Sequence, residues 1–154
     1  MVEAPALEYL FSYTAGIEEP QQAIGAGPFG HRMIARVTGG RSEGPRLEGE
    51  VLPGGGDWAL IDAAGTLRLD ARVTVQTHDG ARIYIQYRGV ITPIDPGTVA
   101  RALDGSLAPG ECYYRTAPVF ETGDARYAWL NTTVAVGVGR LEKEGVAYDV
   151  FGVA

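Results

Sequence analysis

The chain has 154 residues, of which 45% are hydrophobic and 21% are charged, a composition that excludes disordered, collagen-like and coiled-coil proteins. Thirteen basic and nineteen acidic residues give a formal net charge of −6, which argues against a nucleic-acid or anionic-membrane partner. The length fits one domain over residues 1–154, and the 22 glycines and 9 prolines spread along it favour short strands joined by tight turns.

The first half of the chain contains several segments with the period-two pattern of half-buried strands. Residues 16–30 interrupt this pattern with a polar, glycine-rich stretch, which we expect to be an irregular loop over one end of the fold. Pro53 and the glycines that follow it separate the last two of these segments. The predicted strands cover residues 7–15, 31–37, 46–52 and 57–61.

The clearest pattern lies at the centre, where apolar and polar residues alternate over residues 69–77 and again over 82–88. His78, Asp79 and Gly80 between them form a turn signal, so the two segments are predicted to be a hairpin. A helix of about two turns is predicted over residues 96–103, because a proline stands near its start and a glycine follows it.

Extended patterning returns in the last third of the chain, giving eight or nine strands in total. Short antiparallel strands with regular turns allow a sandwich or a barrel, and a barrel is favoured because closing about eight strands removes exposed edges. We therefore predict an all-β protein, a closed, mostly antiparallel β-barrel of about eight strands with one short helix. The remaining predicted strands cover residues 112–117, 127–139 and 146–153.

Several local strings together resemble the family known as domain of unknown function 3237, a group of small β-barrel proteins. They are Leu52–Trp58, Leu69–Ala81, Tyr127–Asn131, and the segment from Tyr114 to Thr122. The resemblance runs from about Leu7 to the C-terminus. It implies a single-domain barrel without a known general activity, some members of which sit beside small-molecule biosynthetic or degradative enzymes.

Asp57 and Trp58 follow three glycines, which let another backbone or a ligand approach closely. A carboxylate at a pocket wall beside an indole would have a raised pKa and could serve as a general acid or base. Alternatively, Asp57 accepts hydrogen bonds from turn amides at a corner of the fold. The sequence leaves both interpretations open.

Arg72 and Tyr84 lie on the polar face of the predicted central hairpin, and Arg115 lies inside another extended segment. If that face lines the barrel interior, these side chains form a polar pocket in which inward arginines need an anionic partner. If it faces water, the valines and isoleucines of the opposite face fill the core instead. Both arrangements fit the pattern.

Trp129 and Asn131 share one face of the predicted strand 127–139, whose two faces both carry apolar residues. A strand covered on both sides makes a homodimer plausible. Asn131 is then either a polar handle in an aromatic wall or a cross-strand hydrogen-bonding residue. The predicted binding site is one cavity shared by Arg72, Arg115 and Trp129, with Trp58 and Asn131 as further contacts.

Metal and cofactor sites lack sequence support. His31, His78 and Cys112 are the only nitrogen and sulfur ligands and have no partner at ligand spacing, and no glycine-rich loop opens a helix after a strand. We expect no metal and no cofactor. One cysteine excludes an intramolecular disulfide, and no signal peptide or spanning segment is visible, which favours a cytoplasmic protein.

Two functions follow from these residues. The first is a cofactor-independent isomerase, cyclase or lyase that holds a small aromatic or polyketide-like molecule inside the barrel, with proton transfer by Asp57 or a nearby tyrosine, Tyr84. The second is a non-catalytic binding or carrier barrel that holds a small-molecule ligand with the same groups.

Overall fold

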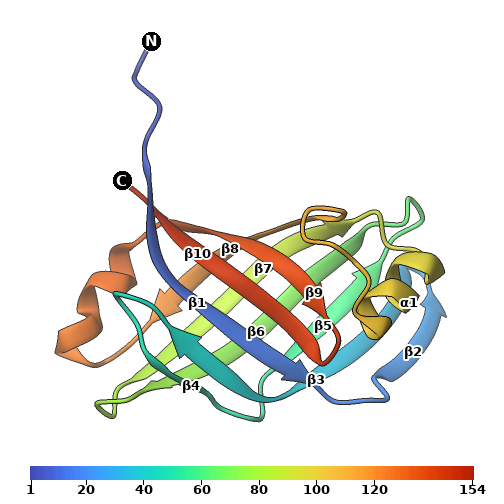
Figure 1. Cartoon of the computed structure of the whole chain (residues 1–154), viewed down its shortest axis with the longest axis horizontal. Helices are drawn as coiled ribbons and strands as arrows, with labels where there is room; N and C mark the ends of the chain where they lie inside the picture. Colours follow the sequence, from blue (N-terminus) through green and yellow to red (C-terminus); the bar gives the residue numbers. More distant parts are fainter.

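The structure, a computed structural model, describes all residues from 1 to 154 and contains ten strands and two short helices (Figure 1). The helices are α1 (Pro96–Asp104) and the 3-10 helix η1 (Ala125–Thr132). The strands are β1 (Leu7–Ile17), β2 (Gln22–Gly27), β3 (Gly30–Glu43), β4 (Gly49–Val51), β5 (Gly56–Ile61), β6 (Leu67–Thr77), β7 (Arg82–Thr92), β8 (Tyr113–Glu121), β9 (Ala135–Glu142) and β10 (Gly145–Val153). Neither helix is long and apolar enough to cross a membrane.

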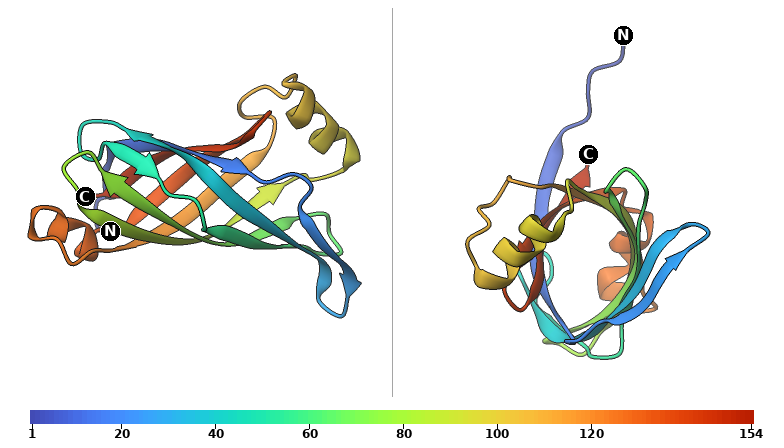
Figure 2. Two further views of the ribbon diagram at one scale, coloured as in Figure 1. Left: turned by 90° about the horizontal axis from the view of Figure 1, so that it is seen from below. Right: turned by 90° about the vertical axis from the view of Figure 1, so that its right-hand side faces the viewer.

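The strands close into a barrel because β1 pairs with β10 on one side and with β3 on the other. Every pairing is antiparallel. β4 and β5 both lie between β3 and β6 and follow one another along them, so together they fill one position in the wall. β2 pairs only with β3 and projects from the end of the barrel that carries α1 (Figures 1 and 2). The predicted closed antiparallel barrel is confirmed.

The central hairpin shows why the sequence folds this way. Val73 pairs with Ile85 and Val75 pairs with Ile83, and all four side chains are buried inside the barrel. Their neighbours in sequence point outward because successive side chains of a strand alternate between its faces. The apolar face of the hairpin therefore supplies the core, and its polar face lies on the outer surface.

The helix prediction is confirmed, and the cap residues explain its limits. The Asp95 side chain accepts a hydrogen bond from the Thr98 backbone N–H at 2.8 Å, which starts α1. Gly105 ends it in a left-handed conformation with φ of 79°. This helix lies at the rim of one end of the barrel and leaves that end open (Figure 2).

Two segment predictions were wrong. Residues 16–30 are not an irregular loop, because β1 continues to Ile17 and most of the rest forms β2 and its turn to β3. Residues 127–139 are not one strand, because η1 occupies the first part and β9 begins at Ala135. Tyr127 and Leu130 are buried three residues apart, the repeat of a 3-10 helix, and Asp124 caps its start by accepting from the Arg126 N–H.

Close packing inside the barrel depends on a glycine in β9. The ring of Tyr114, which is fully buried, lies flat against Gly139, and a β-carbon there would come within 2.6 Å of the ring carbons. Such a contact is far inside van der Waals distance, so any side chain at this position must displace the tyrosine.

Gly139→Ala should therefore destabilise the fold by about 1–3 kcal/mol, the usual cost of overpacking a core. Gly123→Ala is the matched control, because a β-carbon there meets no atom within 4 Å. Urea unfolding should show a lower midpoint for the first variant and an unchanged one for the second. Equal midpoints for the two variants would contradict the packing argument.

Candidate functional site

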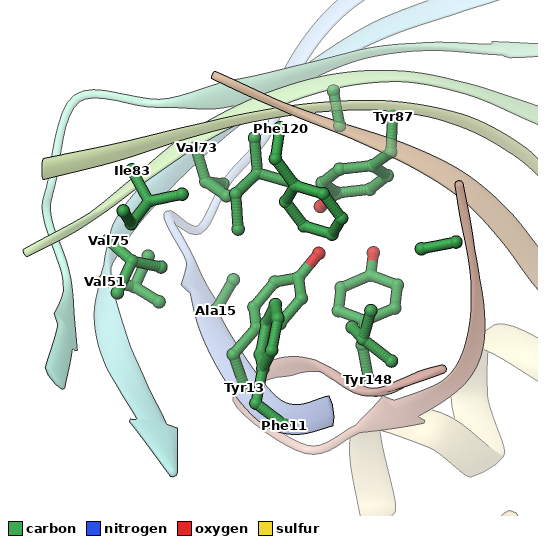
Figure 3. Close-up of a cluster of buried hydrophobic side chains, with 14 of the residues drawn as sticks. Phe11, Tyr13, Ala15, Val51, Val73, Val75, Ile83, Tyr87, Phe120 and Tyr148 are labelled. Atoms are coloured by element: carbon green, nitrogen blue, oxygen red, sulfur yellow. The ribbon is translucent and has the colours of Figure 1, made fainter. Parts of the chain in front are cut away.

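The barrel interior holds a cavity of about 480 Å³ that opens at the end carrying α1. Its wall is mostly apolar, and several inward positions carry residues too small to meet across the barrel. Ala15, Ala35 and Ala59 are examples. At the other end, bulkier side chains such as Val75 and Ile83 fill the same space (Figure 3). The interior is thus solid at one end and hollow at the other.

Four buried tyrosines stand where the solid part meets the cavity: Tyr13 on β1, Tyr87 on β7, Tyr114 on β8 and Tyr148 on β10. The rings of Tyr13 and Tyr148 stack with centroids 4.8 Å apart, and the hydroxyls of Tyr114 and Tyr148 are hydrogen-bonded to each other. In Figure 3 the hydroxyls of Tyr13, Tyr87 and Tyr148 converge near the barrel axis. Tyr87, Tyr114 and Tyr148 line the cavity.

Asp57 is the one acidic residue placed along the inner wall away from the cavity mouth. It pairs with Ala71 across the sheet, and Ala71 pairs in turn with Tyr87, so all three share one level of the barrel. Ala71 has only a methyl group, which leaves the space between the carboxyl group and the tyrosine open. The charge of Asp57 contributes to a raised pKa at both Tyr87 and Tyr114.

The environment of Asp57 disfavours its charged form. Burial raises the pKa of this carboxyl to about 6, and the hydrogen bond that its Oδ1 accepts from the Asp70 N–H at 2.9 Å offsets only part of that effect. The carboxyl group can therefore exchange a proton near neutral pH, which is the property a general acid or base requires. Burial also raises the pKa of Tyr87 to about 12.

Apart from Asp57 and the tyrosine hydroxyls, the polar side chains of the cavity lie at its mouth. They come from the chain before β2, from the start of β3 and from the β9–β10 turn, and the apolar residues Val99 and Leu103 of α1 complete the rim. A ligand that enters the cavity therefore passes a polar rim before it reaches the mostly apolar inner wall. The polar rim residues are Glu19, Gln21, His31, Glu142, Lys143 and Glu144.

Of the residues predicted to form the site, only Asp57 lines the cavity. Trp58 follows it in the strand and so points outward, where the Arg72 guanidinium lies 5.2 Å from its ring centroid. Arg72 also pairs with Asp70 at 3.4 Å on this outer face. Tyr84 is on the outer face as well, because its neighbours Ile83 and Ile85 fill the core.

The predicted cavity shared by Arg72, Arg115 and Trp129 does not form. Arg115 is exposed and lies over the ring of Tyr113, 4.9 Å from its centroid. Trp129 belongs to η1 at the opposite end of the barrel, under the guanidinium of Arg46. Asn131 is exposed in the same helix. It exchanges two hydrogen bonds with the backbone of Thr122, a local loop contact.

The four tyrosines were not among the predicted site residues, although their strands carry a signal for them. Each of them occupies the same alternate positions as the buried apolar residues of its strand. What the sequence did not show is that strands distant along the chain bring the four hydroxyls together. No three or more His, Cys, Asp or Glu side chains lie close enough to hold a metal ion.

Comparison with known proteins identifies the family. Residues 5–153 match the family described as "Protein of unknown function (DUF3237)". The chain belongs to this family. A UPF0311 protein of Rhodopseudomonas palustris is 34% identical over 150 residues, which cover 95% of this chain and 96% of that protein. The crystal structure of a conserved protein of unknown function from the same species superimposes with a TM-score of 0.89 at 31% identity, covering 99% of this chain and 100% of that one.

One more distant relative carries an activity in its name. The hydroalkoxylation enzyme phnH of Penicillium herquei is 29% identical over 133 residues, which cover 86% of this chain and 73% of that protein. The crystal structure of an enzyme from Penicillium herquei superimposes with a TM-score of 0.75 at 25% identity, covering 100% of this chain and 98% of that one. The barrel of this chain is therefore similar to that of an enzyme.

The raised pKa of Asp57 predicts how the stability of the fold depends on pH. Between about pH 4 and pH 6 the folded protein holds a proton that the unfolded chain releases, so stability falls as pH rises through this window and stays lower above it. Asp57→Asn keeps an oxygen for the Asp70 N–H but has no charge. It should be more stable than the wild type at pH 8 by on the order of 1–3 kcal/mol, and about equally stable at pH 4.

Asp62 provides a control of opposite sign. Hydrogen bonds from the Thr66 and Ala64 N–H groups and from Arg68 hold the pKa of this partly exposed carboxyl below its ordinary value. Asp62→Asn should therefore lose stability relative to the wild type at pH 8, and the loss should shrink as the pH falls. Urea titrations at both pH values measure these differences. An Asp57→Asn variant that is less stable than the wild type at pH 8 would show that burial does not penalise the charge.

Proposed function

We propose that this protein is an enzyme that binds a small, largely apolar molecule inside the barrel and transfers a proton to or from it with Asp57. The observation that carries the proposal is the position of this carboxyl group, which is desolvated in the inner wall of a mostly apolar cavity and has a pKa of about 6. A buried charge lowers the stability of the fold. A carboxyl group kept at such a position is therefore a candidate for a functional residue.

The cavity supports a substrate of aromatic or polyketide-like size. Its volume of about 480 Å³ is within the usual range for ligand sites, and its apolar wall favours a planar or hydrocarbon-rich molecule. The expected reactions are isomerisation, cyclisation or elimination. Each of these moves a proton and leaves the oxidation level of the substrate unchanged, so acid–base groups of the chain can perform them without a redox partner.

The similarity to a hydroalkoxylation enzyme supports a reaction of this class. Hydroalkoxylation adds the O–H of an alcohol or phenol across a C=C bond. In the proposed sequence, the protonated carboxyl of Asp57 delivers a proton to an alkene carbon, and the substrate oxygen bonds to the neighbouring carbon. The carboxylate then takes the proton that this oxygen releases. All atoms are retained, and Asp57 returns to its starting state.

The first test uses an ortho-alkenylphenol in D₂O, since this probe carries a hydroxyl and a C=C bond in one molecule. The wild type should form the cyclic ether with one deuterium on carbon, detected by NMR. Asp57→Asn should lower the rate by about a hundredfold or more, the usual contribution of a positioned acid, while probe affinity stays within about tenfold.

Asp62→Asn is the control for this assay, because that carboxyl lies outside the cavity. It should turn the probe over at the wild-type rate. Full activity in Asp57→Asn would remove this residue from the mechanism. Tight binding of alkenylphenols by the wild type, with neither ether formation nor deuterium uptake, would favour the carrier function instead.

A pH–rate profile tests the protonation state. If Asp57 acts first as an acid, the free enzyme must carry its proton, so kcat/KM should be constant well below pH 6 and fall about tenfold per pH unit above it. Tyr87 does not titrate in this range, because its pKa is about 12. A profile that instead rises through pH 6 would assign Asp57 the role of a base in the first step.

A further inference from the structure

The tyrosine cluster at the floor of the cavity has no role in the mechanism above, although it is the most polar part of the buried interior. Its members, Tyr13, Tyr87, Tyr114 and Tyr148, come from four strands and are each at most 3% exposed. Buried hydroxyls are costly unless they are hydrogen-bonded, so the distribution of their hydrogen bonds indicates what the site can bind.

The four tyrosines cannot pair all of their O–H donors with one another. Each tyrosine has one O–H donor and can accept from others. One hydrogen bond within the cluster joins the hydroxyls of Tyr114 and Tyr148, and the ring of Tyr87 packs against the rings of Tyr13 and Tyr148. A chain of hydrogen bonds through all four hydroxyls would have three links and use three donors, so at least one of the four O–H donors has no partner within the cluster. None of the four bonds to a backbone group or to a side chain outside the cluster.

The O–H donor that is left over can reach a molecule bound in the cavity. Tyr87, Tyr114 and Tyr148 line the cavity, so a donor at this floor meets a bound molecule and not the packed end of the barrel. Burial raises the pKa of all four hydroxyls, which keeps them protonated and able to donate throughout the range in which proteins are stable.

We infer that the tyrosine cluster is an oxygen-binding subsite, and that the ligand of this barrel carries a carbonyl, enol or phenol oxygen that accepts a hydrogen bond from it. The inference rests on the proposed function in one respect: the bound oxygen belongs to the molecule on which Asp57 acts. Asp57 shares the level of Tyr87 across Ala71, so a ligand anchored through its oxygen presents neighbouring carbon atoms to the carboxyl group.

The geometry also selects among ligands. Apart from the carboxyl group of Asp57, the cavity wall offers no other side-chain donor at this depth, and the polar residues at the mouth lie at the other end. A hydrocarbon of the same shape would leave the free O–H without an acceptor. A buried donor without a partner loses its hydration and gains no hydrogen bond, so the hydrocarbon should bind more weakly. The substrate class is thus a conjugated ketone, enol or phenol with an apolar body.

The experiment compares acetylnaphthalene, which has an acceptor oxygen, with ethylnaphthalene, which lacks it. Calorimetric titration of the wild type should show at least tenfold tighter binding of the ketone. Tyr87→Phe and Tyr148→Phe should each bring the two affinities within about threefold of each other while leaving the affinity for ethylnaphthalene unchanged. Tyr84→Phe is the matched control, because that tyrosine is on the outer face, and it should retain the full preference.

A second measurement needs no variant and covers the case in which a Tyr→Phe protein does not fold. The infrared C=O stretch of acetylnaphthalene bound to the wild type should lie at lower frequency than in a hydrocarbon solvent, because a hydrogen bond weakens the carbonyl bond. An unshifted stretch, or a wild type that binds both probes equally, would overturn the inference. So would a full preference in both Tyr→Phe variants.

Asp57→Asn separates this inference from the proposed function. The variant should keep the preference for the ketone and the infrared shift, since it retains all four tyrosines. If the wild type shows the preference but no turnover of alkenylphenols, the oxygen subsite stands and the enzyme proposal fails. If turnover depends on Asp57 but the preference does not depend on the tyrosines, the subsite fails alone.

Discussion

The size of the inward-facing side chains determines what this barrel can hold. In a closed antiparallel barrel every second residue of each strand points inward, so the interior is filled or left open position by position. β6 shows the change within one strand: Val73 and Val75 pack in the solid end, and Ala71 marks the level at which the cavity begins. The solid end supplies hydrophobic burial, and the hollow end is free to serve a ligand.

The same constraint separates the charges. Isolated charge inside an apolar barrel costs several kcal/mol, on the order of the penalties for unpaired buried ions. The arginines of the barrel wall accordingly lie outside, where Arg72 meets Asp70 and the face of Trp58. Asp57 is the exception along the inner wall, and it meets the cost by binding its proton more tightly. Its altered acidity is thus a direct result of where the strand alternation places it.

Much of the fold could be predicted from local patterns, because alternation, turns and helix caps act over a few residues. The central hairpin and α1 follow from such signals. η1 did not, because its aromatic residues lead directly into the alternating valines of β9, and only the buried pair Tyr127 and Leu130 reveals the three-residue repeat. The length of β1 and the existence of β2 depend on pairing with β3, which is a tertiary effect.

The site was harder to predict because it depends on which face of each strand points inward. Asp57 and Trp58 are adjacent, so at most one of them can line the cavity, and the burial of Val73 and Ile85 requires Arg72 and Tyr84 to face outward. That constraint was available in the sequence. The meeting of Tyr13 with Tyr148 was not, since it requires the first and last strands to pair and close the barrel.

The cost of Asp57 bears on why a carboxyl group stands there at all. A protein that only stored an apolar ligand would gain by replacing Asp57 with a neutral residue, because the cavity would be less costly to form and more favourable to an apolar ligand. The Asp70 N–H that this carboxyl binds could equally be satisfied by an asparagine oxygen. A neutral residue would meet every structural requirement visible at this position. Only the acid adds an exchangeable proton. It lies on the opposite side of Ala71 from Tyr87, at the inner end of the cavity.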